Sequence, residues 1–236
     1  MLRLLVLAAL VVASLPCHAA DELVGSARMT GGEAVPYVLT SKPGVPAVAV
    51  ILMPVGRGVL NPRLDNGKLA MTLAGNFLIR SRELFADGTV VAASTDATST
   101  PDRILAIVRD LEARYGKLAV YVIGTSRSTE ATMALARSLD GRVAGFVHSS
   151  SMNAIADFDP RGLRSRNLVV LHVRDACRVT RPSSGLATHR KFGTELVEMD
   201  GGRSTGEDCE AYAYHGYNGI EAETVGRIKQ WIAARP

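Results

Sequence analysis

The chain has 236 residues, of which 47% are hydrophobic and 21% are charged. This length and composition are typical of a folded α/β domain with a sizeable core, and they exclude an intrinsically disordered protein. The formal net charge is +4, but the basic residues are scattered without interleaved aromatics, so we expect no nucleic-acid partner.

The first segment has the pattern of a signal peptide. A positive start over residues 1–3 precedes an apolar stretch over 4–15, which is too short to span a bilayer, and small residues follow up to Ala20. We expect residues 1–20 to be cleaved and residues 21–236 to form a single domain, periplasmic or secreted. No later segment is long and apolar enough to predict a membrane span in the mature chain.

Apolar runs alternate with helical periodicities along the rest of the chain. Two short strands around 27–29 and 37–39 are expected to form an antiparallel edge, and the apolar run from Val45 to Met53 is typical of a strand covered on both faces. Further strands are expected at 90–94, 118–123, 143–147, 167–173 and 195–199. Helices are expected at 77–86, from Thr100 to Gly116, after Ser128 with its end at Gly141, at 183–192 and after Asn218. This order predicts a mostly parallel sheet with helices on both faces.

Two connecting segments lack a clear period. Residues 149–166 are expected to form a small cap or a loop, and residues 200–217 form a long Gly-rich loop. Asn218, with Glu221 three residues later, predicts a capping box at the start of the final helix.

The sequence GTSRS, from Gly124 to Ser128, joins a predicted strand to a predicted helix. Small residues two positions before and after Ser126 allow a very tight turn, because larger side chains would collide there. Such a turn is the nucleophile elbow of serine hydrolases, and it places the serine where free N–H groups at a helix N-terminus can meet an oxyanion. Ser128 stands where the usual pattern has glycine. The alternative is an ordinary strand–loop–helix joint with a surface serine.

Reactive groups in open α/β sheets gather at the carboxyl ends of the strands. Ser126 follows one predicted strand, Asp175 follows another, and His215 lies in the loop after the last. A serine hydroxyl needs a base, imidazole titrates near neutral pH, and a carboxylate orients the imidazole. We therefore predict Ser126 as nucleophile, His215 as base and Asp175 as the orienting acid.

Other residues compete for these roles. The alternative bases are His148 and His172, and the alternative acids are Asp96, Asp200 and Asp208. Each histidine is more simply explained as a core or supporting residue, because it lies within or at the end of a strand.

An oxyanion hole is predicted from backbone N–H groups. Arg127 follows the serine, and Val55 and Gly56 lie in the loop after the first central strand. Gly56 could instead serve only as a turn.

Only two cysteines, Cys177 and Cys209, remain once Cys17 leaves with the signal peptide. A pair of cysteines in an exported protein is most simply a disulfide. A metal-binding pair and two free buried thiols are the alternatives.

From about Val45 to Trp231 the chain resembles the α/β-hydrolase superfamily. The resemblance rests on GTSRS, on the strand LVVLHVRD that ends at Asp175, and on HGYNGIE with His215. More narrowly, ACRVT and DGGRSTGEDCEAYAYHGYNGIE resemble small exported bacterial hydrolase-like proteins with paired cysteines. This resemblance implies an α/β-hydrolase fold with a minimal cap.

These observations predict an exported serine hydrolase that cleaves an ester, or secondarily an amide, of a small molecule with no cofactor and no metal. The first alternative is a non-catalytic α/β-hydrolase-like protein that binds a ligand in the same cleft. The second is a metal site formed by His172, His215, Asp175 and a cysteine, although no spacing such as HExxH supports it.

Overall fold

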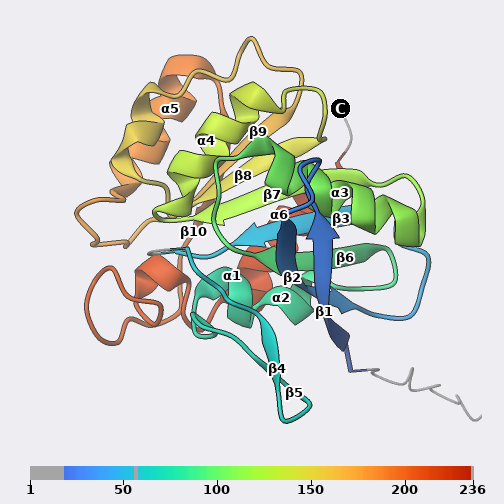
Figure 1. Cartoon of the computed structure of the whole chain (residues 1–236). Helices are drawn as coiled ribbons and strands as arrows, with labels where there is room; N and C mark the ends of the chain where they lie inside the picture. The colour runs from blue at the N-terminus through green and yellow to red at the C-terminus, as the bar shows by residue number, and fades with distance from the viewer. Residues whose placement is uncertain (1–18, 56–57, 235–236) are drawn as a thin grey trace, which may run out of the picture.

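A computed structural model describes residues 19–55 and 58–234. Residues 1–18 of the expected signal peptide lie outside the described residues. An eight-stranded sheet forms the centre of the fold (Figure 1), in the order β1-β2-β6-β3-β7-β8-β9-β10. Its strands are Asp21–Arg28 (β1), Ala34–Ser41 (β2), Val48–Met53 (β3), Val90–Thr95 (β6), Ala119–Thr125 (β7), Gly145–Ser149 (β8), Arg166–His172 (β9) and Glu195–Met199 (β10).

The strand directions confirm the predicted topology. Strand β2 is antiparallel to β1 and β6, and every neighbouring pair from β6 to β10 is parallel. The carboxyl ends of β3, β7, β8, β9 and β10 therefore meet at one edge of the sheet.

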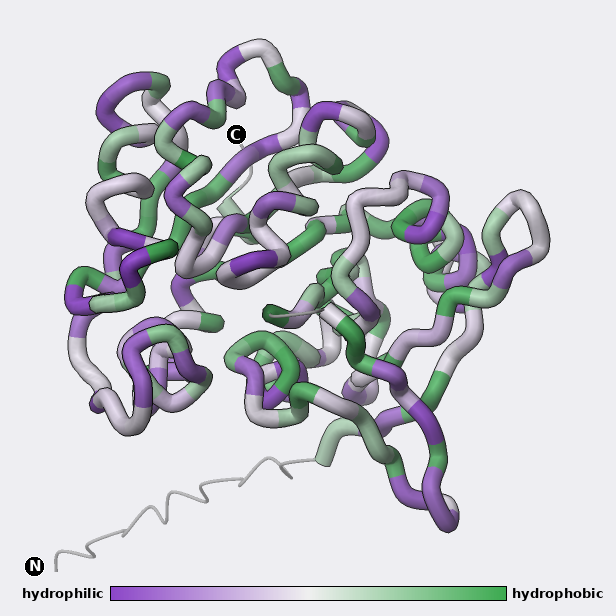
Figure 2. The backbone as a smooth tube through the Cα atoms, turned by 60° about the vertical axis from the view of Figure 1, so that its left-hand side comes forward, coloured by the Kyte–Doolittle hydropathy of each residue, from purple (hydrophilic) through white to green (hydrophobic). Residues whose placement is uncertain are grey.

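Helices cover both faces of the sheet, as predicted (Figure 1). One face is covered by Pro101–Tyr115 (α3), Ser128–Ser138 (α4) and Pro182–Phe192 (α5), and the other by Phe77–Arg80 (α1), Arg82–Phe85 (α2) and Glu221–Ala233 (α6). Along β3, Ala49 and Ile51 belong to the first core, and Val50 and Leu52 to the second. This double burial explains the continuous apolar run, and Figure 2 shows hydrophobic stretches running through the middle of the molecule.

Two local features of the structure differ from what the sequence predicts. The helix expected at 77–86 is two short helices that meet at Ser81. A hairpin of β4 (Arg63–Asp65) and β5 (Lys68–Ala70) was not predicted, although Asn66-Gly67 is its turn and both residues have positive φ.

The predicted capping box at the start of α6 is wrong. The Asn218 amide donates to the carbonyl of Tyr212, and the residue at the cap position is Ile220. The Glu221 carboxylate accepts from the N–H of Gly219 and forms an ion pair with Arg80. The Glu221 side chain that the capping box required is therefore engaged in a long-range ion pair instead.

The connections carry little additional structure. Between β8 and β9 the chain forms a short 3-10 helix, η1 (Asn153–Asp157), and irregular segments, and the 200–217 loop contains a second, η2 (Tyr214–Gly216). Among the described residues, no helix is long and apolar enough to cross a membrane.

Candidate active site

The turn between β7 and α4 has the geometry that its sequence predicts. Strand β7 ends at Thr125 and α4 begins at Ser128, which leaves Ser126 and Arg127 to make the turn. Ser126 has φ of +54°, a left-handed conformation that is uncommon for a residue with a side chain. Its N–H donates to the carbonyl of Ser149 at 3.0 Å, which ties the turn to the end of β8.

The small residues flanking the turn have distinct roles. A Cβ atom on Gly124 would lie 2.9 Å from the carbonyl oxygen of Ser128, so the approach of strand and helix requires glycine. The Ser128 hydroxyl accepts from the Thr125 N–H at 2.8 Å and lies 3.0 Å from the Met53 carbonyl. Serine in place of the usual glycine therefore adds a link between the ends of β3 and β7.

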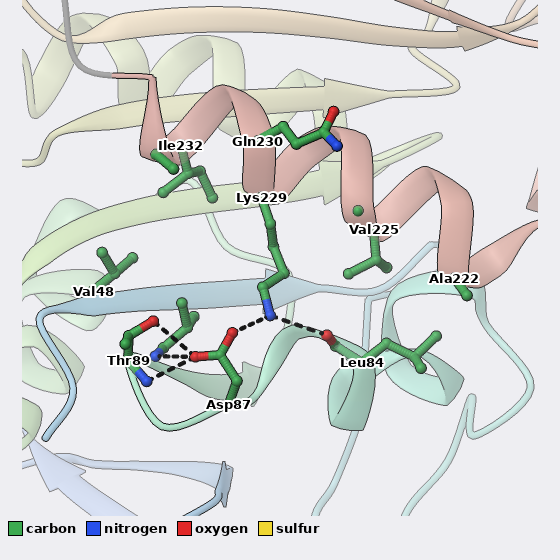
Figure 3. Close-up of a pocket in the computed structure, with 12 residues that line it drawn as sticks. Val48, Leu84, Asp87, Thr89, Ala222, Val225, Lys229, Gln230 and Ile232 are labelled. Carbon is green, nitrogen blue, oxygen red and sulfur yellow. Dashed lines mark hydrogen bonds and ion pairs between the residues drawn. The ribbon is translucent and has the colours of Figure 1, made fainter. Parts of the chain in front are cut away.

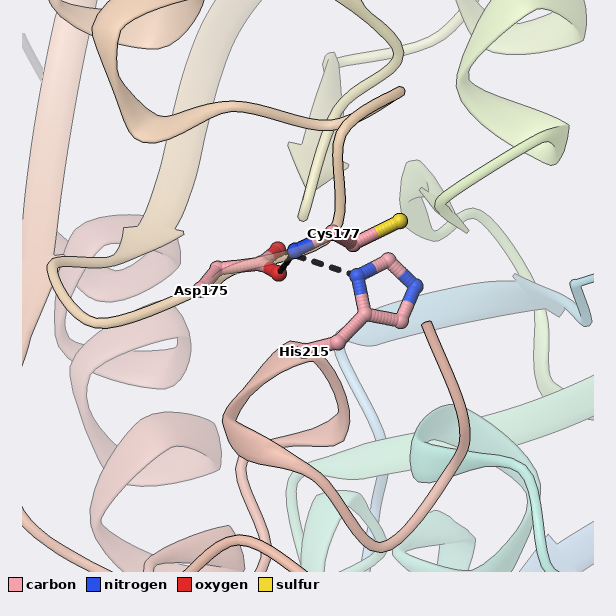
Figure 4. A group of neighbouring side chains, drawn as sticks. All are labelled: Asp175, Cys177 and His215. Atoms are coloured by element: carbon pink, nitrogen blue, oxygen red, sulfur yellow. Dashed lines mark hydrogen bonds and ion pairs between the residues drawn. The ribbon is translucent and has the colours of Figure 1, made fainter. Parts of the chain in front are cut away.

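Asp175 and His215 form a buried pair at the same edge of the sheet (Figure 4). The Nδ1 atom of His215 lies 2.9 Å from Oδ2 of Asp175, and the two residues are 4% and 7% exposed. The other carboxylate oxygen accepts from the N–H of Cys177 at 2.9 Å, and the hydroxyl of Thr180 donates to Oδ2 at 3.1 Å. With Nδ1–H directed at the carboxylate, Nε2 of the neutral imidazole is free to accept a proton.

The histidine loop is held next to the serine turn by a short chain of hydrogen bonds. The hydroxyl of Ser150, which follows the Ser149 partner of the turn, donates to the His215 carbonyl at 2.7 Å. Tyr217 accepts from the Ser150 N–H and donates to the Val170 carbonyl. Burial raises the pKa of Tyr217, which keeps its hydroxyl protonated as a donor.

Among the described residues, no hydrogen bond joins Ser126 Oγ to His215. Such bonds are often long before substrate binds. The structure thus brings Asp175 and His215 into contact and holds Ser126 at the same edge.

The predicted disulfide between Cys177 and Cys209 is present, and it joins residues 32 apart in the sequence. It connects the acid turn to the histidine loop.

Because the sulfur atoms of Cys177 and Cys209 are bonded to each other, the group of Asp175, Cys177 and His215 offers no thiolate to a metal ion. Both ring nitrogens of His172 contact the backbone, at the Gly201 carbonyl and the Arg174 N–H. The predicted metal alternative is therefore left with two of its four ligand groups, Asp175 and His215.

The structure places His148 in the core. It is fully buried between Thr132 and Asn167. Because the Asn167 amide donates to the Ser165 carbonyl, its oxygen accepts from His148 Nε2–H, and Nδ1 accepts from the Thr132 hydroxyl. Burial lowers the pKa of His148 from 6.5 to about 4, so the neutral form is favoured.

This shift predicts a pH dependence of stability. Below pH 6.5 the unfolded chain takes up a proton that the folded chain binds only near pH 4, so stability is full above pH 6.5 and falls between those values. The expected loss is about 3 kcal/mol. In urea unfolding from pH 4 to 7.5, His148→Gln should remove this slope, although the variant is less stable at neutral pH. The exposed His189→Gln should retain it, and a retained slope in His148→Gln would contradict the assignment.

The alternative acids are occupied elsewhere. Asp96 accepts from the N–H groups of Leu60 and Asn61, and Asp200 forms an ion pair with Arg174. Asp208 lies exposed in the loop beside Cys209.

Two of the three predicted oxyanion residues, Arg127 and Val55, lie among the described residues. Arg127 is the N-cap residue of α4, and no hydrogen-bond acceptor for its N–H occurs in the described part of the chain. Val55 lines a cavity together with Thr125 and His215. Gly56 lies outside the described residues.

That cavity has a volume of about 210 Å³ and lies against the histidine loop. One wall is the segment 73–77 and the other contains Cys209, Ala211 and Gly216. Arg80 links the two walls, because its guanidinium donates to the carbonyls of Gly75 and Gly216.

A larger cavity of about 500 Å³ lies between α2, α6 and the start of β3 and β6 (Figure 3). Its lining is mainly aliphatic, and Lys229 forms an ion pair with Asp87 there. Because it adjoins the amino ends of these strands, it lies at the edge opposite to Ser126 and is separate from the candidate site.

No family model matches the sequence, and no curated protein matches it. Solved structures do match the fold. A cold-adapted esterase from an Arctic intertidal metagenomic library is 16% identical with a TM-score of 0.59, over 90% of this chain and 94% of that chain. A serine hydrolase without a lid from Xanthomonas campestris is 12% identical with a TM-score of 0.56, over 94% and 100%. A dienelactone hydrolase from Anabaena variabilis is 13% identical with a TM-score of 0.59, over 89% and 99%.

The chain has the α/β-hydrolase fold. Within it, sequence reasoning missed the residues that shape the site around the predicted trio. Arg80 carries no local signal, because Gly216 and Glu221 lie 136 and 141 positions away. Thr180 lies only five residues after Asp175, but its contact with His215 joins residues 35 apart. Asn76 could have been found, because an Asn before an apolar helical segment is typical of an N-cap.

Proposed function

We propose that this protein is an exported serine hydrolase that cleaves esters of small molecules. The observation that carries the proposal is the buried Asp175–His215 pair, held beside a serine in the left-handed turn between β7 and α4. The esterases among its structural neighbours support the same reaction class.

In the proposed reaction, Nε2 of His215 takes the proton of Ser126 as the serine oxygen attacks the carbonyl carbon. Asp175 holds the ring and stabilises the imidazolium. The N–H of Arg127, together with the N–H groups of Val55 and Gly56 that the sequence predicts for this role, stabilises the oxyanion. His215 then gives the proton to the leaving alcohol, and water hydrolyses the acyl-enzyme by the same steps. An amide requires a poorer leaving group to depart, so esters are proposed first.

A fluorophosphonate probe and a series of short-chain aryl esters test this proposal on the purified mature protein. An activated serine should be labelled stoichiometrically, and ester turnover should be blocked in parallel. A folded protein that is neither labelled nor active would contradict the proposal and favour the non-catalytic binding protein.

Export gives a separate prediction. The first strand begins at Asp21, so removal of residues 1–20 leaves every described element intact. Mass spectrometry of the protein from its native compartment should find an N-terminus near Ala20 or Asp21. A bulk population that retains Met1 would contradict export by a cleaved signal peptide.

The disulfide is expected to support turnover as well as stability. Its loss should release the 200–217 loop from the acid turn and lower the free energy of unfolding by about 3–4 kcal/mol. We expect the reduced protein, and the double variant Cys177→Ser with Cys209→Ser, to show several-fold lower kcat at temperatures where circular dichroism reports a folded chain. Full activity of that folded, reduced protein would assign the bridge to stability alone.

A further inference from the structure

The cavity beside His215 is small and mostly apolar. Its volume of about 210 Å³ is below the roughly 300 Å³ or more of sites for drug-sized ligands, and it suits a group of about seven non-hydrogen atoms. Val55, Leu73 and Phe77 line one side. If the proposed hydrolase function holds, this cavity receives one of the two groups that flank the scissile ester.

Asn76 is one of three buried polar side chains that line this cavity, together with Thr125 and the proposed base His215. Asn76 is 5% exposed, and its N–H closes a turn by donating to the carbonyl of Leu73 at 2.8 Å. Its side-chain oxygen accepts from the N–H of Leu78 at 3.2 Å as the N-cap of α1. That bond identifies Oδ1 and leaves Nδ2 as the second polar atom.

The Nδ2 atom of Asn76 has no hydrogen-bond acceptor among the described residues. The fully covered side-chain atoms without a partner in this part of the chain are the hydroxyls of Ser81 and Ser94. The Asn76 amide is not one of them, and Asn76 lines the cavity.

The fold does not require this donor. Serine, threonine or aspartate would cap α1 equally well through an oxygen. When a hydrocarbon group displaces water from a buried donor, the donor is left without a partner and the binding free energy of that group is less favourable. When the displacing group carries an acceptor atom, the hydrogen bond is replaced and binding is favoured. The other polar side chains of the lining are Thr125, the proposed base His215, and Glu210, whose carboxylate lies on the exposed 200–217 loop and would disfavour an anionic group.

We propose that Asn76 is a specificity residue, and that the substrates are esters whose short acyl or alkyl group carries a neutral acceptor oxygen, as an ether, hydroxyl or carbonyl. Nδ2 donates to this oxygen while the remaining atoms pack against Val55, Leu73 and Phe77. Plain hydrocarbon groups of equal length are poorer substrates because they leave the amide without a partner.

Matched substrate pairs test this inference. In the acyl series, 4-nitrophenyl methoxyacetate is compared with 4-nitrophenyl butyrate, which differs by one oxygen in place of a methylene. In the alcohol series, 2-methoxyethyl acetate is compared with butyl acetate. The variants are Asn76→Asp, which keeps the capping oxygen and removes the donor, and Asn76→Ser, which keeps a cap without adding charge.

The ratio of kcat/KM within each pair is compared between wild type and variants, so intrinsic ester reactivity cancels. We expect both variants to lower the oxygen-to-hydrocarbon ratio about ten-fold in one of the two series. Fluorophosphonate labelling and the melting temperature report whether each variant retains its site and its fold.

Unchanged ratios in both series, in variants that still hydrolyse the hydrocarbon esters, would overturn the role of Asn76 and leave the hydrolase function standing. A wild-type protein that is unlabelled and hydrolyses none of the four esters would instead overturn the proposed function, and this inference with it.

Discussion

Replacing Ser126 with alanine is expected to lower kcat for ester hydrolysis by roughly 10⁴-fold or more and to abolish fluorophosphonate labelling. The hydroxyl is the proposed nucleophile, and its loss removes the covalent step. The fold should survive, because the hydrogen bonds of this turn are made by the Ser126 backbone and by the Ser128 hydroxyl. Alanine tolerates the φ of +54° no better than serine, so a small loss of stability is expected.

Ser128→Ala is the matched control, because it removes a hydroxyl from the same turn. That hydroxyl bridges Thr125 and Met53, so the variant should be destabilised by about 1–2 kcal/mol and yet remain labelled. Labelling that persists in Ser126→Ala and disappears in Ser128→Ala would assign the nucleophile to the other serine.

Replacing Asp175 with asparagine should lower kcat by roughly 10⁴-fold with little change in KM. The N–H of Cys177 requires an acceptor, so the new amide oxygen should face Cys177 and its NH₂ group should face His215. The imidazole must then accept at Nδ1 and carry its proton on Nε2. In that tautomer it cannot take the proton of Ser126.

Asp208→Asn is the control for this change, because its carboxylate lies on the exposed loop beside Cys209. It should leave kcat close to that of the wild type. If Asp208→Asn is the more damaging substitution in steady-state kinetics, the acid has been misassigned. A parallel loss of the melting transition in Asp175→Asn would point to folding instead, so differential scanning calorimetry accompanies the kinetics.

The order of strands and helices could be predicted because both depend on local pattern. The apolar run at 45–53 requires a covered strand, and the GTSRS turn requires small residues wherever a strand meets a helix so closely. The cysteine pairing needed no geometry, since only Cys177 and Cys209 remain after the predicted cleavage. The capping box at Asn218 failed for the opposite reason, because Arg80 binds Glu221 across 141 positions of sequence.

By itself, the sequence determined the α/β alternation, the tight turn at Ser126 and the chain order of the serine, aspartate and histidine. Only the tertiary structure decided which groups contact one another. It paired His215 with Asp175, placed His148 in the core and seated the Asn76 amide in the wall of the cavity. The physical reason is range: periodicity and turn chemistry act within about ten residues, whereas the contacts of the site join segments that meet only when parallel strands align their carboxyl ends.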